Sequence, residues 1–75
     1  MSSGFAVRAE LVGTVCEVAV GDGAPVCGGA TLVVLDSMKM EIPVQAPMAA
    51  TVRRVCVAVG DVVAAGDLLA VLDPI

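Results

Sequence analysis

An internal repeat covers most of this chain and limits the folds that it can adopt. When residues 7–36 are shifted by 37 positions onto residues 44–73, 30 positions align without a gap and 13 of them are identical. The identical pairs are Val7/Val44, Ala9/Ala46, Thr14/Thr51, Val15/Val52, Val18/Val55, Val20/Val57, Gly23/Gly60, Val26/Val63, Gly29/Gly66, Leu32/Leu69, Val34/Val71, Leu35/Leu72 and Asp36/Asp73. A solenoid needs at least about three stacked repeats to bury a continuous core. Two copies must therefore close on each other.

Both halves carry the pattern of short β-strands. Valine-rich alternation with a period of two, bounded by glycine, is typical of strands, and no segment indicates a helix. We expect four strands in each half, at residues 5–9, 14–20, 25–27, 31–36, 41–46, 51–57, 62–64 and 68–72. The pattern predicts an all-β fold, a flattened β-barrel or sandwich of two four-stranded antiparallel sheets related by a pseudo-twofold axis.

The alternation also predicts which side chains fill the core. We expect them to be aliphatic and to occur as equivalent pairs, because the chain has one phenylalanine and no tryptophan or tyrosine. The expected inward residues are Val15, Val18, Val20, Val26, Leu32 and Val34, their partners Val52, Val55, Val57, Val63, Leu69 and Val71, and also Ile42 and Val44.

Size and composition exclude several classes of protein. The 75 residues predict one domain, residues 1–75, which we expect to be a monomer when isolated. A net charge of −4 argues against nucleic acid as a partner. The apolar stretch 55–72 is interrupted by Gly60-Asp61 and Gly66-Asp67, so we expect two strands there and no membrane span. The first residues lack the features of a signal peptide, which predicts the cytoplasm.

The segment between the two repeats contains the only lysine of the chain. Lys39 lies in Ser37-Met38-Lys39-Met40-Glu41. We expect a hairpin that joins strands 31–36 and 41–46, with the lysine at its exposed turn. Taken alone, a lysine is most often a solubilising surface charge, and methionines most often fill gaps in a core. Their symmetric placement at the junction of the repeats favours a site of covalent attachment instead.

This segment resembles the attachment motif of the biotinyl/lipoyl carrier-domain family. The family's usual form is (Ala/Ser)-Met-Lys-Met, and Ala46-Pro47 and the Gly-Asp pairs at Gly60 and Gly66 are also typical of it. Ser37 stands where many members have alanine, and Ala50 stands where glycine is usual. The resemblance extends from about Phe5 to Asp73 and implies the barrel-sandwich hybrid fold. The gapless repeat leaves no room for a thumb-like insertion, so we expect a thumbless carrier.

The resemblance implies a biotin carboxyl carrier. Biotin would be attached to Lys39 by a biotin protein ligase that recognises Ser37, Met38, Met40 and Glu41. The tethered biotin would then carry CO2 from a biotin carboxylase to a carboxyltransferase, where an acyl-CoA or a keto acid is carboxylated. The family implies no catalytic residue and no metal ligand in the carrier, whose contribution is the reach of a tethered cofactor.

Three alternatives stay open on the sequence alone. A lipoyl carrier shares the fold but typically has Asp-Lys-Ala in place of Met-Lys-Met. An unmodified module could use the same hairpin only to bind proteins. We favour a small stand-alone biotinylated protein, similar to those of actinobacterial acyl-CoA carboxylases, over a domain of a multidomain carboxylase.

Overall fold

The structure is a computed structural model that describes residues 4–75. It contains eight β-strands. The strands are β1 (Phe5–Arg8), β2 (Gly13–Val18), β3 (Pro25–Val26), β4 (Thr31–Ser37), β5 (Met40–Gln45), β6 (Ala50–Val55), β7 (Val62–Val63) and β8 (Leu68–Pro74). No helix occurs within the described range. All eight expected strands are present, so the all-β prediction is confirmed.

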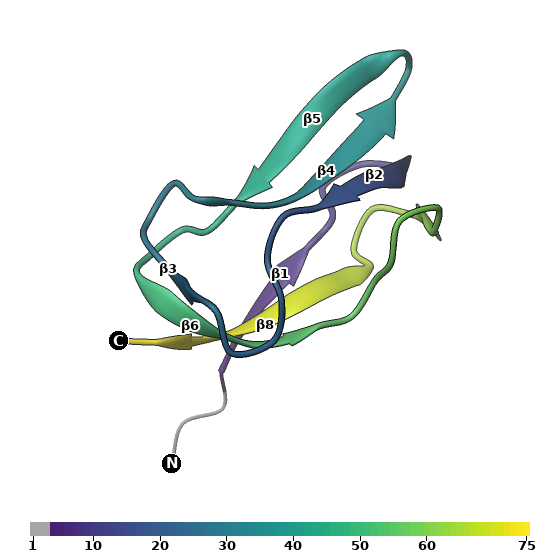
Figure 1. The fold of residues 1–75 in the computed structure, drawn as a ribbon. Helices are drawn as coiled ribbons and strands as arrows, with labels where there is room; N and C mark the ends of the chain where they lie inside the picture. Colours follow the sequence, from purple (N-terminus) through teal and green to yellow (C-terminus); the bar gives the residue numbers. More distant parts are fainter. Residues whose placement is uncertain (1–3) are drawn as a thin grey trace.

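The strands form two antiparallel four-stranded sheets (Figure 1). One sheet has the order β1-β8-β6-β3 and the other has the order β5-β4-β2-β7. Replacing each strand by its repeat equivalent converts the first order into the second, as a pseudo-twofold axis requires. The molecule measures 38 × 19 × 17 Å, and the β4–β5 hairpin projects at one end, away from the start of β1 and from the C-terminus (Figure 1).

Backbone hydrogen bonds join the two halves reciprocally. The Val15 amide donates to the Asp61 carbonyl at 2.8 Å, and its equivalent, the Val52 amide, donates to the Ala24 carbonyl at 2.8 Å. The Gly60 amide likewise donates to Val15. Each half thus provides hydrogen-bond partners for backbone amides and carbonyls of the other half. Without these partners, the buried groups would have no hydrogen bond. This exchange explains why two copies suffice for a closed domain.

The core consists of two clusters that the pseudo-twofold axis exchanges. The first contains Val7, Val26, Leu32, Ala46, Ala50, Val52, Ala70 and Leu72. The second contains Ala9, Val15, Val33, Leu35, Val63 and Leu69, each the equivalent of a residue in the first. Val44 packs against both clusters. The aliphatic core that the repeat predicts is therefore present, with four leucines among its fully buried side chains.

The prediction that Val34 and Val71 point inward was wrong. Both are only partly buried, whereas their neighbours Val33 and Ala70 are 0% and 1% exposed. The register of β4 against β5 shifts between Thr31 and Val33, so that Leu32 is an extra, unpaired residue. Such a bulge moves the alternation of the strand by one residue. Leu69 produces the same shift in β8 against β1.

Other expected core residues lie at its margin. Val18, Val20, Val55 and Val57 are partly buried and pack against the clusters, and Ile42 is also half-buried. The second and sixth strands end at Val18 and Val55, two residues earlier than expected. Beyond them, the amides of Ala19 and Cys56 donate to the bulge residues Leu32 and Leu69.

The bulge in β4 predicts unequal effects for two neighbouring valines. Val33→Ala removes two methyl groups from a fully buried site and should lower the free energy of unfolding by about 2 kcal/mol. Val34→Ala, the matched control, should cost less than about 1 kcal/mol because its side chain is only partly removed from water. Urea denaturation of both variants measures the difference. A larger loss for Val34→Ala would contradict the observed phase of β4.

Candidate functional site

A two-residue turn connects β4 to β5. Ser37 pairs with Met40 at the end of the ladder, and Met38 and Lys39 form the turn between them. Their φ angles are 52° and 65°, and no other non-glycine residue within 4–75 has positive φ. Two successive positive φ angles are the requirement of a type I′ turn, in which Asn-Gly is the preferred sequence. The hairpin therefore holds two bulky residues in a conformation that they rarely adopt.

The side chains of the turn are directed to solvent. Met38 is 92% exposed and Met40 is 65% exposed, and Lys39 is also exposed. The methionines therefore do not fill gaps in the core. No described residue forms a hydrogen bond or an ion pair with the Lys39 amine. The ε-amino group is free at the apex of the turn.

A hydrogen bond that the sequence did not predict holds the turn end of the hairpin. The Ser37 hydroxyl donates to the Val12 carbonyl at 2.8 Å. Val12 lies in the segment between β1 and β2 and is 60% exposed. This contact joins residues 25 positions apart. No periodicity or motif signalled it, because it depends on how the two sheets close.

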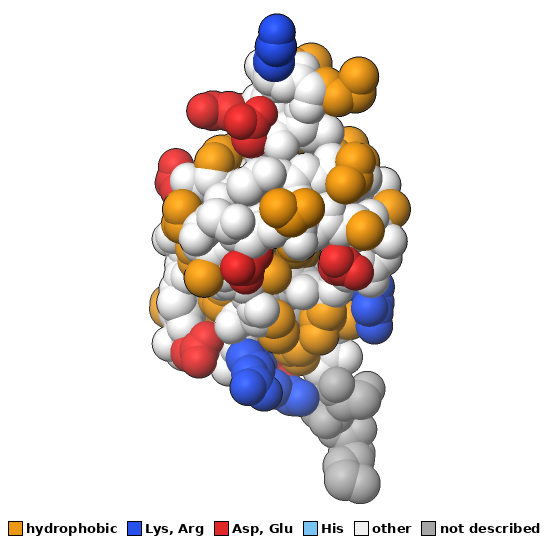
Figure 2. All heavy atoms as spheres, turned by 90° about the vertical axis from the view of Figure 1, so that its right-hand side faces the viewer, with side chains coloured by type: hydrophobic (Ala, Val, Ile, Leu, Met, Phe, Trp, Pro, Cys, Tyr) orange, Lys and Arg blue, Asp and Glu red, His pale blue; other side chains and the backbone are white. Residues whose placement is uncertain are grey.

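Acidic residues lie on one side of the hairpin. Asp36 and Glu41 face each other across β4 and β5, where like charges are unfavourable. The pKa of the nearby Cys16 thiol is raised, chiefly because water is partly excluded from its sulfur and further because Glu41 and Asp36 are close. The Cys16 Sγ lies 3.4 Å from the Val34 carbonyl. Basic, hydrophobic and acidic groups thus gather around the hairpin, at the top of Figure 2.

Other kinds of site receive no support from the described part of the chain. Its cysteines, Cys16, Cys27 and Cys56, are exposed and free. No group of three or more His, Cys, Asp or Glu side chains within residues 4–75 could hold a metal ion. A helix long and apolar enough to cross a membrane is likewise missing from these residues.

The residues that the sequence singled out therefore form one structural unit. Ser37, Met38, Lys39, Met40 and Glu41 occupy the end of β4, the turn and the start of β5. Of these, Ser37 is the least exposed, because its hydroxyl is bonded to the neighbouring loop. The exposed amine and the two methionines are the groups that another protein can reach.

Comparison with known proteins identifies the family. The model of the Biotin_lipoyl family, described as biotin-requiring enzyme, matches residues 5–72. The chain belongs to this family. The resemblance seen in the sequence is thereby confirmed, and the chain is a biotin carrier domain. None of the comparisons favours the lipoyl or the unmodified alternative.

Relatives of the carrier domain include small proteins. A homolog of the biotinylated protein TB7.3 from Mycobacterium leprae is 56% identical over 56 residues, which is 75% of this chain and 79% of that protein. The homolog from Mycolicibacterium smegmatis is 60% identical over 40 residues, which is 53% of this chain and 56% of that protein.

Solved structures place the same fold inside large enzymes. A single-chain, multi-domain long-chain acyl-CoA carboxylase matches with a TM-score of 0.91 and 46% identity, covering 100% of this chain and 8% of the carboxylase. The urea carboxylase of Kluyveromyces lactis matches with a TM-score of 0.89 and 28% identity, covering 96% of this chain and 6% of that enzyme. The carrier domain thus spans only a small part of either enzyme.

The positive φ angles predict that the turn reduces the stability of the carrier domain. Replacing Met38-Lys39 by Asn-Gly, as Met38→Asn with Lys39→Gly, should raise the free energy of unfolding by roughly 1–2 kcal/mol, since these residues tolerate the left-handed region. Met40→Asn is the control, because Met40 is exposed on the same hairpin but lies in a strand. Urea denaturation compares the variants. An unchanged stability of the Asn-Gly variant would show that the turn is unstrained.

Proposed function

We propose that Lys39 carries the biotin of this carrier domain, joined by an amide to the ε-amino group. The observation that carries the proposal is the position of the only lysine, with a free amine, at the apex of the hairpin. An acylating enzyme that reads the hairpin therefore meets a single nucleophile there.

The residues around Lys39 fit a group that must leave the carrier domain. The turn has no described partner for the amine, and the nearest apolar side chains, Met38 and Met40, are directed to solvent. A cofactor at this point would extend beyond the barrel instead of entering its core. The antiparallel ladder from Thr31↔Gln45 to Ser37↔Met40 holds the base of the turn. The attachment point is thus both exposed and held in place.

We further propose that the carrier domain serves a biotin-dependent carboxylase. When bound, biotin would supply a ureido nitrogen at which CO2 can be carried to an acceptor. This chain would contribute no acid, base or metal to those reactions, and its part would be to present Lys39 to a biotin carboxylase and then to a carboxyltransferase. A tether raises the local concentration of the carried group at both sites without new contacts. The carboxylase structures with the same fold support this role.

Recognition by a biotin protein ligase is the second part of the proposal. Met38 and Met40 offer flexible and polarisable contacts on either side of the amine. Glu41 adds a charge beside them, and the Ser37–Val12 hydrogen bond fixes the angle of the hairpin. Action in the cytoplasm as a monomer is part of the same proposal and is tested by fractionation and light scattering.

Lys39→Arg should abolish biotinylation and leave the fold intact, because arginine keeps the charge but offers no acylable amine at this site. Intact mass and streptavidin blotting after co-expression with a biotin protein ligase measure the outcome. The matched control, Lys39→Arg with Arg54→Lys, restores one lysine on β6 and should also stay unmodified. A biotin signal in either variant would refute attachment at the hairpin lysine.

Met38→Asp with Met40→Ala should slow biotin transfer by at least about tenfold, a loss of roughly 1.4 kcal/mol in transition-state stabilisation. The ligase would lose both apolar contacts beside an unchanged lysine. The rate of biotin incorporation at limiting ligase is the measurement, and Val59→Asp, an exposed apolar residue outside the hairpin, is the control. Equal rates in the double variant and the wild type would exclude the methionines as recognition elements.

A further inference from the structure

A groove of about 540 Å³ lies between β1 and β5. These are the edge strands of the two sheets, since β1 pairs only with β8 and β5 pairs only with β4. The groove walls include residues 5–8 and 42–45, which are equivalent under the 37-residue offset. The pseudo-twofold axis therefore passes through the groove. The proposed role of the hairpin does not use this surface.

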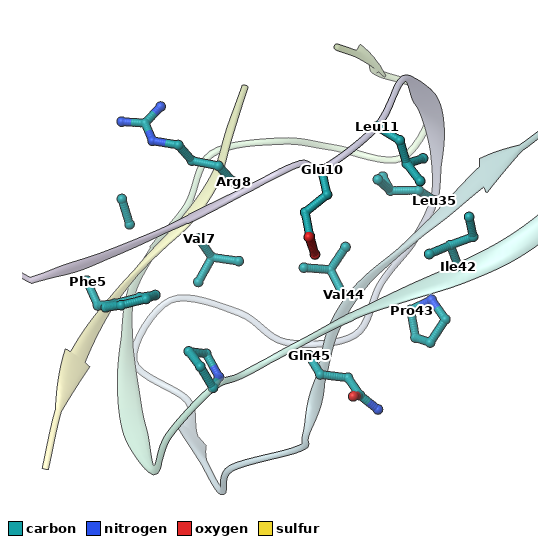
Figure 3. Close-up of a pocket in the computed structure, with 12 residues that line it drawn as sticks. Phe5, Val7, Arg8, Glu10, Leu11, Leu35, Ile42, Pro43, Val44 and Gln45 are labelled. Atoms are coloured by element: carbon teal, nitrogen blue, oxygen red, sulfur yellow. The ribbon is translucent and has the colours of Figure 1, made fainter. Parts of the chain in front are cut away.

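The groove has two apolar ends. Figure 3 shows Phe5 at one end and Leu11, Leu35 and Ile42 at the other, with Val7 and Val44 between them. Phe5 is the only aromatic residue of the chain and is 40% exposed. An aromatic ring exposed beside other apolar groups is typical of the anchor positions of binding surfaces.

A single free charge projects into the groove between these ends. The Glu10 side chain extends from the segment after β1 toward Val44 (Figure 3). No ion pair or hydrogen bond joins its carboxylate to a described residue. Arg8 does not neutralise it, because the Arg8 guanidinium donates to the Gly66 carbonyl at 3.0 Å and points to the other side of the strand (Figure 3). The groove is therefore complementary to an apolar segment that carries a cation.

The edge of β1 determines how such a segment would bind. An edge strand presents unpaired amide and carbonyl groups to which another chain can add. Pro43 removes an amide from β5, whereas β1 contains no proline. In an extended segment, alternate side chains point to the same face, and positions i and i+4 lie about 13 Å apart. A cation at i+2 would then face Glu10 while aliphatic residues at i and i+4 occupy the two apolar ends.

We propose that this groove binds an extended segment of a protein partner, which adds to β1 as a further strand and places a lysine or arginine between two aliphatic residues. The groove recognises the segment by its aliphatic residues at positions i and i+4 and by its positive charge at position i+2. It engages the carrier domain beside the hairpin and leaves the Lys39 amine free. The groove would thus hold the domain on a partner while the hairpin stays accessible to a reaction site.

The test uses the full chain, labelled with 15N, and the peptide acetyl-Val-Thr-Lys-Thr-Val-amide. Its apolar and basic positions are the same read in either direction, so strand orientation does not matter. Amide shifts should change at residues 5–11 and at the non-proline residues of 42–47, in both the biotinylated and the unmodified chain. The matched peptide with Glu in place of Lys should bind at least about fivefold more weakly. If the biotinylated and the unmodified chain show the same shift changes, binding in the groove does not depend on Lys39. A failure of this proposal can then be distinguished from a failure of the assignment of Lys39.

Two variants complete the experiment. Glu10→Gln should weaken binding of the lysine peptide about fivefold and should remove its preference over the glutamate peptide. The control is Glu17→Gln. Glu17 is exposed on β2 and does not line the groove, so this variant should leave the affinity unchanged. The proposal is overturned by the absence of binding, by shift changes centred on Asp36 and Glu41, by equal affinity for the two peptides, or by equal effects of the two variants.

Discussion

The fold depends on backbone hydrogen bonds that each half of the chain makes to the other. Val15 and Val52 occupy equivalent positions, and each exchanges hydrogen bonds with the turn of the opposite half. Neither half could bury its valine face or satisfy these groups alone, because the partner donors and acceptors belong to the other copy. The hairpin, the groove and the leucine core all follow from this exchange, which brings the edges β1 and β5 to one side and leaves the junction of the repeats as a projecting turn.

Several features could be predicted because they depend on local pattern and on the repeat. The number and type of strands follow from valine alternation and glycine turns, and the place of Lys39 follows from its position between the two copies. Features that depend on closure could not be predicted. Val33 replaces Val34 in the core because a bulge at Leu32 shifts the strand, and no residue type marks that bulge. The Ser37–Val12 hydrogen bond and the approach of Glu10 to Val44 join segments that only the closed barrel brings together.

The two halves have kept the architecture and diverged in surface chemistry. In the second half, the carboxylates of Asp61 and Asp67 accept hydrogen bonds from the amides of Ala58 and Ala64 and so close their turns. In the first half, Ala24 and Ala30 occupy the equivalent positions, and the turns are closed by backbone bonds alone. Symmetry is retained where backbone and core require it. It is lost at exposed positions, where Glu10 corresponds to Pro47 and only one half contributes a charge to the groove.

The arrangement of the described ends has a geometric consequence for anything fused to this domain. The first described residue, Gly4, and the C-terminus lie opposite the hairpin (Figure 1), along a molecule whose longest dimension is 38 Å. A protein or surface joined to either end would act as a pivot, and the lysine would lie at the far end of a rigid lever. A small rotation at the pivot then displaces the amine through a wide arc. The length of the domain thus adds to the distance over which a linker can move the lysine.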